Sequence, residues 1–79
     1  MNNYVKERDD AFIDFVLNGN MDKVRKYCRK YGVSIPHDKN IFAAGIYKAV
    51  QKCIDIPEEI KLLATQKCLE IGFNPFMWR

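Results

Sequence analysis

The sequence predicts an all-α fold of about four helices, arranged as two stacked helix-turn-helix hairpins. Three observations lead to this prediction. Apolar side chains recur at helical spacing in four segments. Glycine or proline separates each segment from the next. The sequence has no Asn-Gly turn flanked by alternating residues, which is the arrangement typical of a β-hairpin. A chain of 79 residues holds only one small core, so a single helical domain spanning 1–79 is expected.

The first predicted helix runs from about Tyr4 to Leu17. Its apolar stripe consists of side chains at helical spacing: Val5, Phe12, Ile13 and Val16. Phe15 and Leu17 widen this stripe. The segment "NGN" at 18–20 ends this helix and starts the next. Gly19 suits the left-handed position after a helix, and Asn20 suits the N-cap of the helix that follows.

The second predicted helix follows Asn20 and ends at Gly32. One face is apolar and is formed by Met21, Val24, Tyr27, Cys28 and Tyr31. The other face is a basic cluster, which consists of Lys23, Arg25, Lys26, Arg29 and Lys30. Against a single acid, Asp22, these five side chains give segment 20–32 a charge of +4 in a chain of net charge +3. Any electrostatic function is therefore expected on this helix.

The third predicted helix runs from Lys39 or Asn40 to Cys53, with Asp38 or Asn40 as its cap. It follows the connector "VSIPHDKN", in which Pro36 prevents helix formation at the preceding residue. The stripe of this helix consists of Phe42, Ile46, Ala49, Val50 and Cys53. The small residues 43–45, Ala-Ala-Gly, are expected to let a neighbouring helix approach closely.

The fourth predicted helix opens at "DIPEE" and ends at Gly72. Pro57 is placed in its first turn, beside two glutamates that favour the positive end of the helix dipole. Its inner face consists of Ile60, Leu63, Ala64, Cys68 and Ile71. Across all four helices, the predicted core consists of Phe12, Val16, Val24, Tyr27, Phe42, Ile46, Val50, Ile60, Leu63 and Ile71.

Two stretches align at a period of 40 residues, "VRKYCRKYGVS" (24–34) and "ATQKCLEIGFN" (64–74). The segment "NGNMDKVRKYCRKYGV" resembles the second helix of an ankyrin-type repeat, and "CLEIGFNP" resembles the close of one. The resemblance implies helical hairpins of about 33 residues that stack to build a protein-binding surface. The chain departs from that family where "KNIFAAG" replaces the Thr-Pro-Leu-His motif, and its second hairpin is longer than the family's repeat.

Nothing in the sequence predicts catalysis, a cofactor or a metal site. Cys28, Cys53, Cys68 and His37 are widely separated, whereas structural zinc ligands usually come in close pairs. We expect the three cysteines to be reduced thiols packed in the core. The sequence has no glycine-rich phosphate loop, and its paired acids lie at helix starts, where they have a structural reason to be. An enzyme is therefore not expected.

The location expected from the sequence is the cytoplasm. No apolar run approaches the roughly 20 residues that span a bilayer. The first ten residues, "MNNYVKERDD", lack the apolar region of a secretory signal. We therefore expect neither a membrane segment nor secretion.

Two surfaces are candidates for binding a partner. The basic cluster suits an acidic protein or phosphate groups, although it lacks the Asn, Gln, Ser and Thr side chains that read bases. A solvated helix face would have the same composition. The tail residues Phe76, Met77 and Trp78 either fold back and cap the core, with Trp78 buried, or bind a partner that includes a second copy of the chain.

The function expected from these features is that of a small non-catalytic intracellular protein–protein interaction module. The alternative is a nucleic-acid-associated accessory protein that uses the basic face of the second helix. Products of phages and mobile elements that act on host proteins have a similar size and character.

Overall fold

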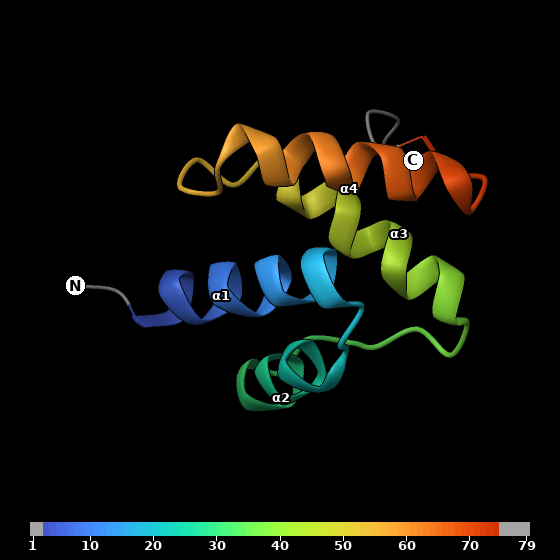
Figure 1. Cartoon of the computed structure of the whole chain (residues 1–79). Helices are drawn as coiled ribbons and strands as arrows, with labels where there is room; N and C mark the ends of the chain where they lie inside the picture. The colour runs from blue at the N-terminus through green and yellow to red at the C-terminus, as the bar shows by residue number, and fades with distance from the viewer. Residues whose placement is uncertain (1–2, 75–79) are drawn as a thin grey trace.

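The computed structural model describes residues 3–74, and these residues form four α-helices and no strand (Figure 1). The helices are α1 (Asn3–Asn18), α2 (Asp22–Tyr31), α3 (Lys39–Val50) and α4 (Glu58–Glu70). The all-α fold class predicted from the sequence is confirmed. The tail residues Phe76, Met77 and Trp78 lie outside the described residues, so their predicted role stays a prediction.

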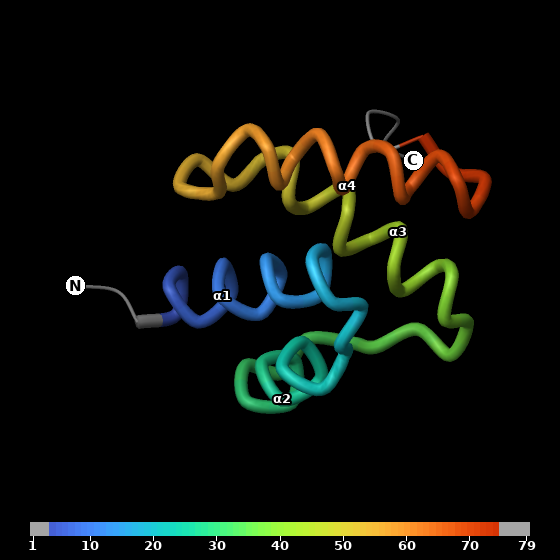
Figure 2. The backbone as a smooth tube through the Cα atoms, in the orientation of Figure 1, coloured from blue at the N-terminus to red at the C-terminus, as the bar shows by residue number. Residues whose placement is uncertain are grey.

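Helix α1 makes the contacts between the two hairpins. α1 packs against α2, α3 packs against α4, and α1 also contacts both α3 and α4. The ammonium of Lys67 in α4 donates a hydrogen bond to the backbone carbonyl of Val16 in α1. The backbone trace shows the same order, with α1 between α2 and the second hairpin (Figure 2). The predicted stack of two hairpins is confirmed, and within the described range α2 packs on α1 alone among the helices.

Local chemistry sets the helix ends. The carboxylate of Asp38 accepts hydrogen bonds from the backbone N–H groups of Asn40 and Ile41, at 2.8 and 3.2 Å, and so caps α3. α3 ends at Val50, not at Cys53 as predicted, because the N–H groups of residues 51–53 bind carbonyls three residues earlier. That tighter turn carries the chain out of the α-helix.

The starts of α2 and α4 differ slightly from the prediction. Met21, not Asn20, directly precedes α2, although the Asn20 side chain still accepts a hydrogen bond from the N–H of Asp22 at 2.9 Å. Pro57 lies just before α4, not inside its first turn, and its carbonyl accepts from the N–H groups of residues 60 and 61. Both helices therefore start one residue later than the cap signals suggest.

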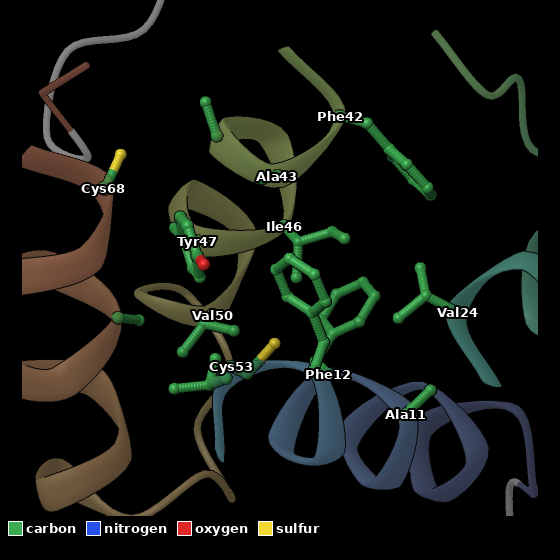
Figure 3. Packing of buried hydrophobic residues seen from close by; sticks show 14 of the residues in the cluster. Ala11, Phe12, Val24, Phe42, Ala43, Ile46, Tyr47, Val50, Cys53 and Cys68 are labelled. Atoms are coloured by element: carbon green, nitrogen blue, oxygen red, sulfur yellow. The ribbon is translucent and has the colours of Figure 1, made fainter. Parts of the chain in front are cut away.

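The core joins side chains from all four helices (Figure 3). Seven of the predicted core residues are buried: Phe12, Val16, Val24, Tyr27, Phe42, Ile46 and Val50. The other three predicted core residues, Ile60, Leu63 and Ile71, are only partly buried. The fully buried positions of α4 are instead Ala64 and Cys68, both 0% exposed. Small side chains let helices approach closely, so the larger residues of α4 lie at the edges of the contact.

Candidate functional site

The structure separates the basic cluster into three lysines that line one hollow and two arginines that are not among its lining residues. Lys23, Lys26 and Lys30 line a hollow of about 340 Å³ between α1 and α2. Glu7 and Asp10 of α1 line the same hollow. Because two acids share this hollow with three lysines, its positive charge is partly offset within the protein.

Lys30 is the clearest example of this pairing. Its ammonium lies 2.8 Å from the carboxylate of Glu7. The hydroxyl of Tyr31 donates to the same carboxylate oxygen at 3.3 Å. The hydrogen bond between Lys30 and Glu7 lowers the pKa of Glu7 and raises the pKa of Lys30. This flank of α2 is therefore a mixed surface in which at least one lysine has an internal acidic partner.

Arg25 and Arg29 form the second group. An α-helix turns about 100° per residue, so these arginines lie on the flank next to Val24 and Cys28, the residues that precede them. Arg29 is exposed, whereas Arg25 is partly buried and its guanidinium lies 3.9 Å from the sulfur of Met21. The two arginines are one helical turn apart and do not line the lysine hollow.

An apolar groove of about 270 Å³ runs between α2 and α3, and we call it the α2/α3 groove. Its floor and walls include residues of three helices: Phe12, Val24, Cys28, Phe42, Ile46 and Ala49. Figure 3 shows four of these side chains converging: Phe12, Val24, Phe42 and Ile46. Two further apolar residues line the groove and are accessible to solvent: Val33 has 45% and Ile41 has 51% of its surface exposed. The groove therefore continues the core to the surface.

Gly45 lines the same groove, and this corrects a prediction. The sequence suggested that Gly45 lets another helix approach closely, but a Cβ added there would meet no atom within 4 Å. Ala43 and Ala44, its two neighbours in the small-residue run, are buried in the core, while Gly45 is exposed. The run therefore serves helix packing on one side of α3 and leaves open space on the other.

The three cysteines are free and buried, as predicted. Burial raises the pKa of the thiols of Cys28, Cys53 and Cys68 above the ordinary value. In the described part of the chain, no three His, Cys, Asp or Glu side chains gather into a group that would hold a metal ion. The described thiols therefore lie in the core.

We expect the thiols to react with a disulfide reagent far more slowly in the folded protein than after unfolding, by at least about tenfold at neutral pH. Burial limits access, and the raised pKa reduces the fraction of thiolate, which is the reactive form. Because the pKa of each thiol is higher in the folded state, the folded protein is stabilised below the ordinary thiol pKa. That stabilisation is lost as the pH rises through the raised pKa. Absorbance-monitored labelling with and without denaturant measures this. Rapid labelling of even one thiol in the native protein would contradict it.

Among the described residues, none of the helices is long and apolar enough to cross a membrane. Sequence reasoning placed the candidate sites on the basic cluster and the tail, and it missed the α2/α3 groove. One signal was present in the sequence. Ile41 lies off the apolar stripe of its helix and one turn before Gly45. A large apolar side chain therefore lies next to a residue that has no side chain, on the outer face of the helix.

Comparison with family models, curated proteins and solved structures finds no match to this chain. The resemblance to ankyrin-type repeats therefore stays a prediction.

Proposed function

We propose that this protein is a small non-catalytic protein–protein interaction module that uses the α2/α3 groove. The observation that carries the proposal is an apolar groove open to solvent, with Val33 and Ile41 accessible and Gly45 leaving room beside them. Accessible apolar surface at a concave site is typical of places where another chain binds. The cytoplasmic location expected from the sequence fits this role, and we include it in the proposal.

Nucleic-acid association through α2 is the second candidate. Its support is the number of basic side chains on one short helix. Two features weigh against it. Three of those side chains share a hollow with Glu7 and Asp10, and Lys30 is paired with Glu7 at 2.8 Å. A phosphate backbone would have to compete with these acids, so we rank this function below protein binding.

A photo-reactive amino acid placed at position 45 tests the first function. Gly45 is exposed in the groove and its Cβ direction is open, so the probe should fit without disturbing the fold. The matched control carries the same probe at Gln66, an exposed position on α4. Irradiation in cells of the source organism should cross-link a discrete protein from position 45 and not from position 66, and that protein should bind the purified module.

Three results would contradict the proposal. Equal cross-linking from both positions would mean that the groove is not the binding surface. Cross-links to DNA or RNA in place of protein would favour the second candidate. No specific cross-link from position 45, with the probe-bearing protein folded and abundant, would leave the proposed function without its binding partner.

A further inference from the structure

We propose that the α2/α3 groove binds an amphipathic helix of a partner protein, and that the flank of this helix facing α2 is acidic. This inference rests on the proposed function and adds the chemistry of the occupant. It follows from the shape of the groove, from the positive charge beside it on α2, and from the open position at Gly45.

The shape of the groove favours a helix that inserts a few side chains. A volume of about 270 Å³ lies just below the range of roughly 300–1,000 Å³ typical of pockets for small molecules. The groove also lies between two helices that do not pack on each other within the described residues, and Phe12 of α1 forms part of its floor. A helix laid between α2 and α3 would complete the bundle, with apolar anchors one turn apart pointing to Phe12.

Charge beside the groove on α2 sets the partner's polar flank. Arg25 and Arg29 directly follow Val24 and Cys28, two lining residues, so they lie one turn apart and about 100° around α2 from those lining positions. Acidic residues one turn apart on the partner helix would match this spacing. The nearest acid in the connector, Asp38, already accepts two backbone hydrogen bonds as the cap of α3. Among the described residues, the two arginines beside the groove therefore favour an acidic occupant.

Position 45 permits a blocking variant that should keep the fold. Gly45 is in a helix and is not among the glycines with positive φ, and a Cβ placed on it would have no atom within 4 Å. Replacing a helical glycine also improves helix propensity. Gly45→Trp should therefore fill the groove without unfolding the protein. Gln66→Trp adds the same ring to the exposed face of α4 and serves as its control.

The experiment selects binders from a displayed library of helical peptides that share an apolar stripe and carry randomised flanks. Selection on the full wild-type chain should enrich Asp and Glu on one flank. The selected peptides should lose at least about tenfold in affinity for Gly45→Trp and little for Gln66→Trp. With the double variant Arg25→Glu/Arg29→Glu, selection should shift to Lys and Arg flanks, and binding of the original peptides should weaken.

Enrichment of neutral or basic flanks on the wild type, or equal binding to Gly45→Trp, would overturn the inference. So would peptide binding that appears only after Phe76, Met77 and Trp78 are replaced by serine, because the chain's own tail would then occupy the groove. A concentration-dependent dimer that Gly45→Trp abolishes would assign the groove to a second copy. If a cross-link from position 45 identifies a protein partner without such a helix, this inference fails while the proposed function stands.

Discussion

Replacement of Phe15 by alanine is expected to lower the free energy of unfolding by about 3–5 kcal/mol. Phe15 is 3% exposed, and its ring centroid lies 5.3 Å from that of Tyr47 in α3. Removing a core aromatic side chain typically costs about 3–5 kcal/mol, which includes the cavity that remains. A chain of 79 residues is expected to have a total stability of about 4–12 kcal/mol. The substitution therefore removes a large share of that stability, and it does so in α1, the helix that joins both hairpins.

Denaturant titration followed by far-ultraviolet circular dichroism measures this effect. Leu17→Ala is the matched control, because Leu17 belongs to the same helix but is 51% exposed. We expect its free energy of unfolding to stay within about 0.5 kcal/mol of the parent. Equal losses for the two variants would mean that α1 does not bury Phe15 as described.

These two residues also illustrate how far the sequence predicts the fold. Helical periodicity identified all four helices and most of the core. It grouped Phe15 and Leu17 together as a widening of one stripe, because both lie close to the main apolar stripe on the helical wheel. Only the contacts of α1 with α3 and α4 decide that Phe15 is covered and Leu17 is not. Burial at the edge of a stripe is a tertiary property that periodicity does not contain.

The candidate site was less predictable than the fold, for a similar reason. The basic cluster was visible in the sequence, but its division into a lysine hollow and an arginine flank depends on where α1 lies. The α2/α3 groove depends on two helices that do not pack closely on each other in the described part of the chain, and a gap between elements leaves no periodic signal. Sequence patterns report which face of a helix is buried. They do not report what remains open between two helices.

Removal of Arg8 is expected to produce the second largest loss of stability, because it strands a buried acid. Asp9 is 7% exposed, and one of its carboxylate oxygens accepts hydrogen bonds from the Nε and Nη2 of Arg8 at 3.1 and 2.9 Å. Burial works to lower the pKa of Arg8, but the hydrogen bond to Asp9, together with the charges of Asp9, Cys53 and Tyr27, raises it overall. Breaking a buried ion pair by deleting one partner costs about 3–5 kcal/mol. The Arg8 side chain is 27% exposed, so water screens part of this, and we expect a loss of about 2 kcal/mol for Arg8→Ala.

A double-mutant cycle separates the free energy of the Arg8–Asp9 interaction from the other effects of replacing either side chain. Arg8→Ala, Asp9→Leu and the combined variant are compared by denaturant titration. If an unpaired buried charge is the cause, adding Asp9→Leu to Arg8→Ala should restore part of the lost stability, because an apolar side chain has no charge to desolvate.

The exposed pair Lys6–Asp10 on the same helix, 3.5 Å apart, supplies the control, and Lys6→Ala should change the free energy of unfolding by no more than about 0.5 kcal/mol. Simple additivity of the Arg8 and Asp9 substitutions would contradict the coupling, and the buried position of Asp9 would then need another explanation.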